Sequence, residues 1–418
     1  MRTIPLLLAS AAVISSGVGC TPSVRTPSAS AGSIPLVIGY LASWGVRTKG
    51  MRIADLPARD LSHIFYAFAK IDDDGRVALG DPCVDTAVCA NSPKDSSEVP
   101  FDPETLGPGG NFGELQRLKA RNPHLKLLIS VGGWTGSGKF SDAALSDASR
   151  RKFAESAIDV FIRRLPRLFD GIDIDWEFPV SGGMEGNIER PVDRENFTLL
   201  LAELRRQLDA QGVKDKRHYE LTIAASARAP EIANIDLVRI EPLLDFINVM
   251  TYDYHAAPGT TNFNSPLYSG ANDPTPSWNV HASMVSFIGG GVPARKLLVG
   301  VPFYGHAYGQ VPNVNAGLFQ PGTQNPVGWK QGDGDWRTLA RTRLVDSRYV
   351  RHWEPTARVP WLYDSTSGTW VSYDDAESVA AKAAYVRQRG LGGVVIWELG
   401  GDDGTLIRAI SESLRGSN

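Results

Sequence analysis

Three acidic residues alternate with apolar residues in one short segment of the chain. Asp173, Asp175 and Glu177 are separated by Ile174 and Trp176. In a β-strand, alternate side chains point to the same face, so the three carboxyl groups would lie side by side. Buried carboxylates at this spacing cannot all ionise, and at least one should keep a proton at neutral pH. The segment is therefore a candidate for general acid–base catalysis, in which a positioned carboxyl gives and takes protons.

Two other interpretations of this segment are a metal site and an exposed edge strand. Calcium and magnesium take carboxylate ligands, but ligands in one stacked column suit a proton relay better than a cage. No second acidic cluster in the sequence would face this column, so no metal is expected. An edge strand with its acids in solvent would bury only the opposite, apolar face, and Pro179 follows the segment directly.

Short apolar runs alternate with helical patterns along most of the chain. The predicted strands cover residues 37–41, 63–69, 125–131, 171–177, 221–225, 246–252, 297–301 and 394–398. The clearest helical patterns cover residues 111–121, 146–165, 194–211 and 375–389. Alternating strands and helices predict a parallel sheet, and eight such strands predict an α/β fold of the (β/α)₈ (TIM) barrel type. The first strand is not followed by a glycine-rich phosphate loop, which argues against a dinucleotide-binding sheet. In a barrel, the three acids would point inward, with Glu177 at the mouth formed by the carboxyl ends of the strands.

The connection between the last two predicted strands is too long for one helix, at roughly 90 residues. We assign residues 305–372 to a small α+β insertion domain, and residues 35–304 and 373–415 to the barrel. The insertion contains five tryptophans: Trp329, Trp336, Trp353, Trp361 and Trp370. Most of them are expected in the core of the insertion, and one or two are expected to face the groove at the barrel mouth.

The composition excludes several classes of protein. The chain has 418 residues, of which 42% are hydrophobic and 21% charged, a mixture typical of globular rather than disordered chains. Its 43 basic and 46 acidic residues give a net charge of −3, with no basic stripe that would bind nucleic acid.

The first 19 residues have the pattern of a signal peptide. A short positive start at Arg2 precedes a small apolar stretch that is too short to span a membrane. The segment ending at Cys20 resembles a bacterial lipoprotein cleavage box, in which the cysteine becomes lipid-modified, although Gly17 stands where leucine is usual. Simple cleavage near Gly19 or after Ala31, with free secretion, is the alternative. Residues 20–34 are rich in small polar residues and proline and predict a flexible tether. We therefore expect export from a bacterial cell, either anchored to a membrane through Cys20 or secreted.

Cys83 and Cys89 are the remaining cysteines of the chain. They lie six residues apart in a polar segment of an exported protein, which favours a local disulfide. The alternative is a zinc site, but no histidine lies near them in the sequence.

Several segments combine into a recognisable series of motifs. They are the acidic segment at residues 170–177 and the segments at residues 39–44, 63–68, 130–134, 250–253 and 395–398. In this order they resemble the motifs of glycoside hydrolase family 18, the chitinases. The long insertion resembles the chitinase insertion domain of one subfamily. The resemblance implies substrate-assisted retaining catalysis, in which the acetamido oxygen of the sugar is the nucleophile. Glu177 would be the general acid and then the base, Asp175 would orient the acetamido group, and Asp173 would hold a proton. No cofactor is implied.

The resemblance also implies roles for residues at other strand ends. Tyr252 would donate to the acetamido carbonyl, Asp253 would hold the distorted sugar, and Trp397 would lie beneath it. Trp134 would stack on the leaving-side sugar, since sugar rings pack on indole faces. The remaining implied contacts involve Met250, which packs under the acetamido methyl, Tyr40 and Ser130, which hydrogen-bond Asp173, and Phe68, which binds substrate. Ordinary packing or a satisfied core hydroxyl is the structural alternative for these residues.

The implied partner is chitin or its oligosaccharides, and a monomer is expected. Two other functions remain open. An endo-β-N-acetylglucosaminidase acting on N-glycans or peptidoglycan would use the same chemistry. A non-catalytic chitin-binding lectin would share the fold, but such relatives usually lose the acid that Glu177 supplies.

Overall fold

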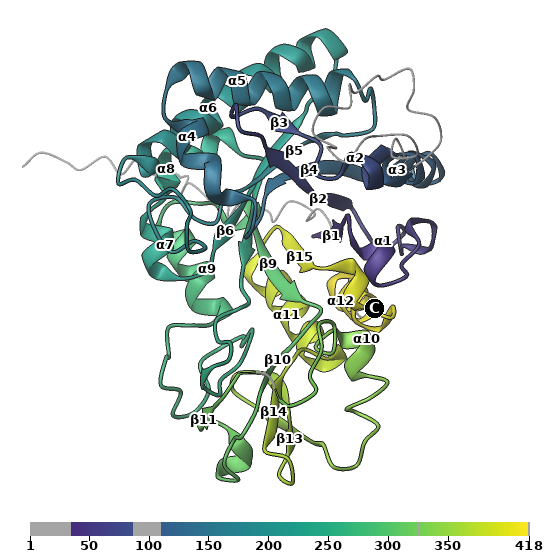
Figure 1. Ribbon diagram of the computed structural model, residues 1–418, viewed down its shortest axis with the longest axis vertical. Coiled ribbons are helices and arrows are strands. Elements are labelled where there is room, and N and C mark those ends of the chain that lie inside the picture. The colour runs from purple at the N-terminus through teal and green to yellow at the C-terminus, as the bar shows by residue number, and fades with distance from the viewer. Residues whose placement is uncertain (1–34, 87–109, 325, 417–418) are drawn as a thin grey trace, which may run out of the picture. The chain divides into compact units, whose positions relative to one another are not determined.

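The computed structural model describes residues 35–86, 110–324 and 326–416. Its main sheet is a closed barrel, because β1 pairs with both β2 and β15 (Figure 1). The eight parallel strands are β1 (Leu36–Ala42), β2 (His63–Ile71), β4 (Lys126–Gly132), β5 (Gly171–Asp175), β6 (Glu220–Ser226), β7 (Phe246–Met250), β9 (Leu297–Pro302) and β15 (Gly393–Trp397). The predicted (β/α)₈ barrel is thus confirmed. The short strand β3 (Val77–Ala78) pairs antiparallel with β2.

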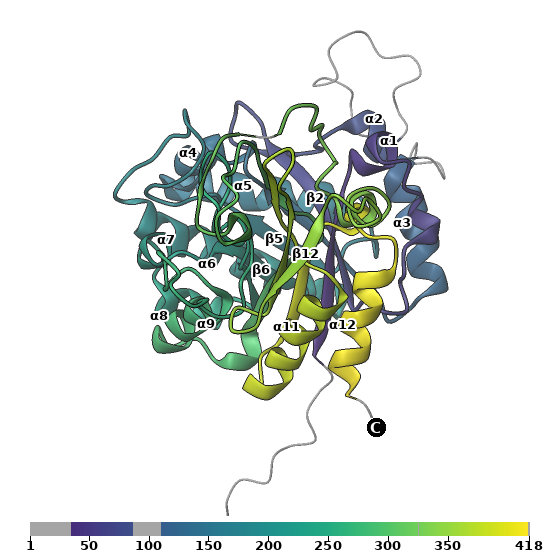
Figure 2. The same cartoon turned by 90° about the horizontal axis from the view of Figure 1, so that it is seen from below.

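The barrel strands are buried on both faces. Residues pointing inward form one apolar cluster, which includes Ile38, Phe65, Leu128 and Val395. Residues pointing outward pack in a larger cluster with the surrounding helices. Figure 2 shows these helices around the strands in a second view. This double burial explains why the strands are nearly continuous apolar runs in the sequence.

The four helices predicted from the sequence are present as α3, α5, α6 and α11, and some predicted elements end at other residues than expected. The bounds of the helices are α1 (Gly45–Thr48), α2 (Pro82–Thr86), α3 (Gly110–Arg121), α4 (Phe140–Ala144), α5 (Asp147–Ile158), α6 (Asp193–Asp215), α7 (Ala229–Ala233), α8 (Leu237–Ile240), α9 (Val280–Gly289), α10 (Trp336–Leu339), α11 (Ala376–Arg389) and α12 (Thr405–Arg415). The helix predicted over residues 146–165 changes at Asp159 into a π-helical turn that ends at Arg163. The strand predicted over residues 171–177 ends at Asp175, so Glu177 lies just beyond the ladder.

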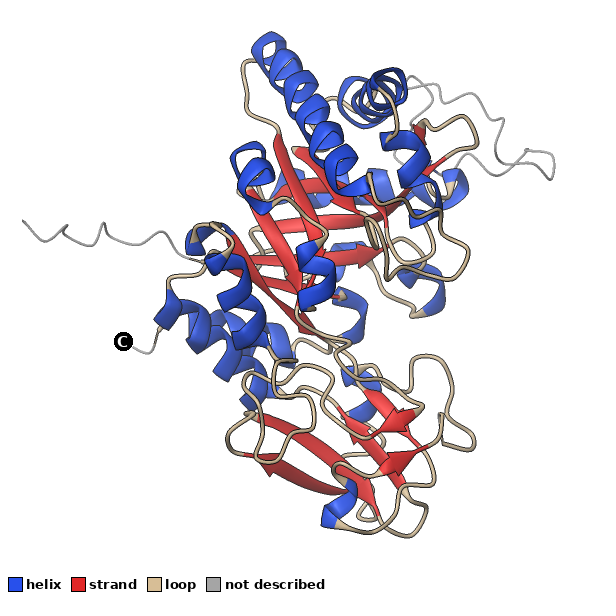
Figure 3. Ribbon diagram, turned by 90° about the vertical axis from the view of Figure 1, so that its left-hand side faces the viewer, coloured by secondary structure: helices blue, strands red, loops and turns tan. Residues whose placement is uncertain are grey.

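A second, antiparallel sheet lies between β9 and β15 in the sequence and apart from the barrel strands in space (Figure 3). Its strands, in sheet order, are β10 (His306–Tyr308), β14 (Thr369–Ser372), β13 (Val359–Asp364) and β12 (Val350–Glu354). A separate pair joins β11 (Pro321–Gly322) to β8 (Gly259–Thr260), and Phe263 packs into the same core, so the loop after β7 also contributes to this region.

The tryptophans of this region are mostly core residues. Trp336, Trp361 and Trp370 are buried, and Trp329 and Trp353 are half-buried. One or two of the five tryptophans were expected to face the groove at the barrel mouth, but none of them lines either of the two cavities described below. Trp361 instead donates to the carbonyl of Ala316, a partner within the same small core.

Cys20 and Cys89 lie outside the described residues, as do the predicted signal peptide and tether. Cys83 lies in α2. No helix in the described part of the chain is long and apolar enough to cross a membrane.

Candidate active site

Two adjoining cavities open at the carboxyl ends of the barrel strands. The first has a volume of about 290 Å³ and is lined by Tyr40, Trp44, Phe68, Trp134, Thr135, Asp175, Glu177, Ala224, Met250, Tyr252, Asp253 and Trp397. The second, of about 360 Å³, is lined by Trp134, Glu177, Phe178, Ser226, Ala227, Arg228, Met250, Tyr252 and Asp253. Glu177 lines both, so its carboxyl lies where a chain extending through the two cavities would pass.

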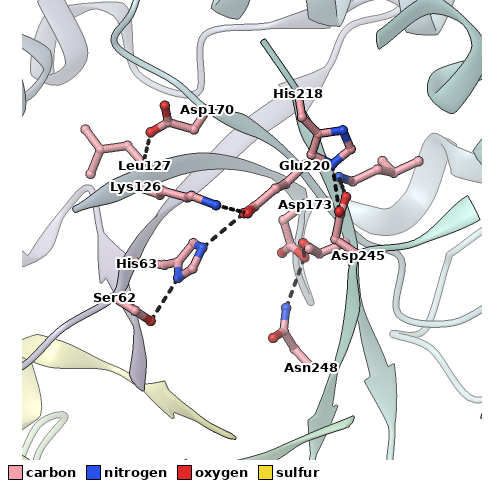
Figure 4. A network of polar contacts seen from close by, with 12 residues as sticks. Ser62, His63, Lys126, Leu127, Asp170, Asp173, His218, Glu220, Asp245 and Asn248 are labelled. Carbon is pink, nitrogen blue, oxygen red and sulfur yellow. Dashed lines mark hydrogen bonds and ion pairs between the residues drawn. The ribbon is translucent and has the colours of Figure 1, made fainter. Parts of the chain in front are cut away.

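Asp173 lies at the bottom of the acidic column and is fully buried. One carboxylate oxygen accepts hydrogen bonds from the hydroxyls of Tyr40 and Ser130, both at 2.8 Å, as predicted. The other accepts from Thr222 at 2.6 Å and Asn248 at 3.3 Å, the latter drawn in Figure 4. Burial raises the pKa of Asp173, and the four hydrogen bonds oppose that increase.

Asp175 is the middle member of the column, and its environment disfavours a charge. The residue is buried, and its Oδ1 has no hydrogen-bond partner among the described residues. Burial and then the neighbouring carboxyls of Glu177 and Asp173 raise the pKa of Asp175 well above its ordinary value. A buried carboxyl oxygen without a partner is costly in a folded protein, and a polar group of a substrate would relieve that cost.

Glu177 is held just beyond the strand by its backbone. Its N–H donates to Ser137 Oγ at 2.9 Å, and its carbonyl accepts from the side-chain amide of Asn187 at 3.1 Å. Burial, followed by the charge of Asp253, raises the pKa of Glu177 to about 8. The carboxyl is therefore mostly protonated at neutral pH, the state that a general acid requires.

Two residues that follow β7 complete this side of the site. Burial, then the carboxyl of Asp175, raises the pKa of Tyr252 well above its ordinary range, so the phenol remains a hydrogen-bond donor. The carboxylate of Asp253 accepts from the hydroxyl of Tyr304 at 2.6 Å and contacts His306 Nε2 at 2.7 Å. Tyr304 and His306 were not among the residues predicted for the site, although both follow β9, the barrel neighbour of β7.

Aromatic side chains line the other side of the first cavity. The ring of Trp397 stacks on Phe68 at 5.7 Å between centroids and lies 5.3 Å from Tyr40. Trp44, which was not among the predicted site residues, continues this row at 6.2 Å from Phe68. Trp134 stands apart from the row with 48% of its surface exposed. Exposed indole at a cavity wall is suited to packing against the apolar faces of sugar rings.

A different polar network lies at the opposite end of the barrel, where the strands begin (Figure 4). His63 contacts Ser62 at 2.9 Å and Glu220 at 3.0 Å, and Lys126 donates to the same glutamate. Asp170 accepts from the backbone N–H of Leu127 at 2.8 Å. These contacts join adjacent strand ends and indicate a stabilising role, in keeping with this face of the barrel.

The family is decided by comparison with known proteins. The model of the family "Glycosyl hydrolases family 18" matches residues 36–402. This chain belongs to glycosyl hydrolase family 18. It is 40% identical to Chitinase A1 of Niallia circulans over 396 residues, covering 88% of this chain and 56% of that protein. Chitinase ChiA74 from Bacillus thuringiensis is 34% identical with a TM-score of 0.83, covering 92% of this chain and 70% of the other. A family 18 N-acetylglucosaminidase from Paenibacillus barengoltzii is 34% identical with a TM-score of 0.74, covering 91% and 99%.

The residues predicted for this family 18 site converge in the structure. All of them line the first cavity except Asp173 and Ser130, which lie beneath it in direct contact with each other. Within the described residues, no group of three or more His, Cys, Asp or Glu side chains could hold a metal ion. Non-proline cis peptide bonds occur beside the cavity at Ala67–Phe68, Glu177–Phe178 and Trp397–Glu398, which the sequence analysis did not anticipate.

Proposed function

We propose that this family 18 chain is a chitinase that hydrolyses β-1,4 bonds between N-acetylglucosamine units, with Glu177 as general acid and base. The observation that carries the proposal is the position of Glu177, which lines both cavities and follows Asp175, whose Oδ1 is buried without a partner. The raised pKa of Glu177 supports its role as the acid. The aromatic row and Trp134 provide surfaces on which a linear chain of sugars can pack.

In the first step, the protonated carboxyl of Glu177 gives its proton to the glycosidic oxygen as the bond to the anomeric carbon breaks. The acetamido oxygen of the same sugar attacks that carbon and forms a cyclic oxazolinium ion. Asp175 accepts a hydrogen bond from the acetamido N–H and stabilises the positive ring, which agrees with an Oδ1 that lacks a partner in the free protein. The hydroxyl of Tyr252 donates a hydrogen bond to the acetamido oxygen and keeps its proton.

In the second step, the Glu177 carboxylate removes a proton from water, and the water oxygen attacks the anomeric carbon. The oxazolinium ring opens, the acetamido group is restored, and Glu177 is again protonated. Two successive inversions retain the configuration of the anomeric carbon. Asp173, beneath Asp175, shares a proton with Asp175 as the carboxyl of Asp175 turns to the substrate. Asp253 holds the sugar from the side of β7.

The high pKa of Glu177 predicts the alkaline limit of activity. The protonated form of Glu177 is active. On the alkaline side of the pH profile, kcat/KM should therefore be constant below a pH of about 8 and fall as the pH rises through about 8. The profile of kcat/KM for N-acetylglucosamine hexamer between neutral and alkaline pH checks this. A decline centred near the ordinary glutamate pKa would contradict the environment that we describe for Glu177.

A second candidate is an endo-β-N-acetylglucosaminidase that cleaves after N-acetylglucosamine in N-glycans or peptidoglycan. One structural relative is named an N-acetylglucosaminidase. The chemistry would be unchanged because it needs only the acetamido group. Parallel assays of chitin hexamer and a high-mannose glycopeptide separate the two. Cleavage of the hexamer alone is expected, and faster cleavage of the glycopeptide would overturn the chitinase assignment. Binding of the hexamer without cleavage would favour the lectin.

We further propose that the protein is exported, with residues 1–19 as signal peptide and residues 20–34 as tether. The proposed barrel covers residues 35–304 and 373–415, and the proposed insertion covers residues 305–372. Lipidation of Cys20 would anchor the protein to a membrane, and Cys83 would pair with Cys89. The expected result is that Cys20→Ser moves the protein from the membrane fraction to the soluble fraction of the producing cells. Unchanged partitioning would exclude the lipid anchor.

A further inference from the structure

Trp44 and Trp397 lie on either side of Phe68 in the aromatic row of the first cavity, which Tyr40, Trp397, Phe68 and Trp44 form. The two tryptophans are held by different parts of the fold. Trp397 ends the barrel strand β15 and lies opposite Pro302 of β9 in the ladder. Its carbonyl also accepts from the N–H of Phe303 at 2.8 Å. Trp397 is therefore fixed by the barrel itself.

Trp44 lies just past the last barrel hydrogen bond of its segment, in which the N–H of Ser43 donates to the carbonyl of Ala67 at 2.8 Å. It follows β1 and precedes the single turn α1, where its carbonyl accepts from the N–H groups of Arg47 and Thr48 at 3.0 and 2.9 Å. Its side chain is 41% exposed. A single helical turn is only marginally stable by itself, so contacts at its far end contribute to holding Trp44 in place.

Lys49 ends this turn and ties it to the barrel. Its N–H donates to the carbonyl of Gly45 at 2.9 Å, while its ammonium group contacts Glu398 Oε1 and lies 2.8 Å from Asp335 Oδ2. Arg337 also donates to the backbone carbonyl of Lys49 at 2.5 Å.

The two carboxylates around this ammonium group come from different segments. Glu398 directly follows Trp397, and its second oxygen accepts from the N–H of Gly400 at 2.9 Å. Asp335 belongs to the inserted region, where its backbone forms an isolated antiparallel β-bridge with Tyr304. All three charged side chains are at most 19% exposed. Solvent therefore screens these pairs less than it would screen surface pairs.

We propose that Lys49 is a positioning residue that fixes Trp44 relative to Trp397, and thereby sets the affinity of the first cavity for long sugar chains. The inference rests on the proposed function, since it assumes that sugars pack along the aromatic row. Lys49 itself does not line the cavity and is not a catalytic residue. Its ion pairs instead connect the end of the Trp44 turn to the residue after Trp397.

The test measures binding of N-acetylglucosamine hexamer by calorimetry in the Glu177→Gln background, where cleavage does not interfere. We expect Lys49→Met to weaken binding about tenfold and Lys49→Arg, which keeps the charge, to stay within about twofold. Lys296→Met is the matched control, because Lys296 is similarly buried and pairs with Glu241 at 2.7 Å beside the start of β9. It should bind within about twofold of the background protein, and thermal unfolding should show that all variants are folded.

A double-mutant cycle distinguishes positioning from a general structural effect. In a Trp44→Ala background, Lys49→Met should cost less than about twofold in affinity, because the side chain on which it acts is gone. Glu398→Gln serves in place of Lys49→Met if the latter does not fold, with the same expectation. Equal binding by Lys49→Met and the background protein, or an undiminished loss without Trp44, would overturn the role of Lys49. Failure of the Glu177→Gln protein itself to bind hexamer would overturn the proposed function, and the role of Lys49 with it.

Discussion

Replacement of Glu177 by glutamine should lower kcat for N-acetylglucosamine hexamer by at least about 10³-fold, within the range that general acid–base catalysis supplies. Glutamine has nearly the same shape but no proton to give to the glycosidic oxygen. The side chain is held through backbone contacts to Ser137 and Asn187, which the substitution leaves in place. Hexamer binding, measured by calorimetry, should therefore persist.

The matched control is Glu220→Gln, the same substitution in a buried glutamate of the same barrel. Glu220 contacts His63 and Lys126 at the end where the strands begin, away from both cavities. This variant should lose stability, since it weakens a buried network, but keep kcat within a few-fold. Near-normal turnover by Glu177→Gln, or an equal loss by Glu220→Gln, would remove Glu177 from the role of general acid.

Replacement of Asp175 by asparagine should lower kcat by about 10²- to 10³-fold, the cost typical of losing one preorganised electrostatic contact to a transition state. The carboxylate is needed most when the oxazolinium ring carries its positive charge. Asparagine retains the shape but cannot supply a negative charge. The variant should therefore lose more affinity for a stable thiazoline mimic of that ring than for the hexamer itself.

Asp245→Asn is a suitable control for this second variant. Asp245 precedes β7 at the far end of the barrel and accepts from the N–H of Leu221 at 2.8 Å, so its loss should affect folding rather than turnover. The role of Asp175 would be refuted by wild-type turnover in Asp175→Asn, or by equal losses of affinity for the hexamer and the mimic.

The acidic column was predictable because strand geometry is local. Alternation alone placed Asp173 and Asp175 inside the barrel and Ile172 and Ile174 in the outer core, as found. Trp176 likewise packs outward, with its ring stacked on Phe140 at 5.3 Å. The barrel strands were equally recognisable in the sequence, because strands buried on both faces are nearly continuous apolar runs.

The partners of the acids were harder to predict because they come from distant strands. Thr222 and Asn248 are polar residues inside apolar strands, which the sequence shows. Their contacts with Asp173 depend on the register of β6 and β7, which the sequence does not show. Tyr304 and Trp44 lie beyond strand ends, where the chain leaves the ladder and periodicity no longer reports the direction of a side chain.

The tryptophans of the inserted region were predicted only in part. Most were expected in a core of the insertion, and Trp361 and Trp370 do form one, but they pack there with Phe263 from the loop after β7. That core joins segments about 100 residues apart, and no local pattern could anticipate such a long-range contact.

The most direct test of substrate-assisted catalysis through Glu177 is the anomeric form of fresh product from N-acetylglucosamine hexamer, observed by proton NMR before mutarotation. The wild-type protein is predicted to release the β-anomer first, and Glu177→Gln is predicted to release no product in the same time. Early release of the α-anomer would contradict the retaining mechanism, and cleavage by the variant at a rate near that of the wild type would contradict the assignment of Glu177.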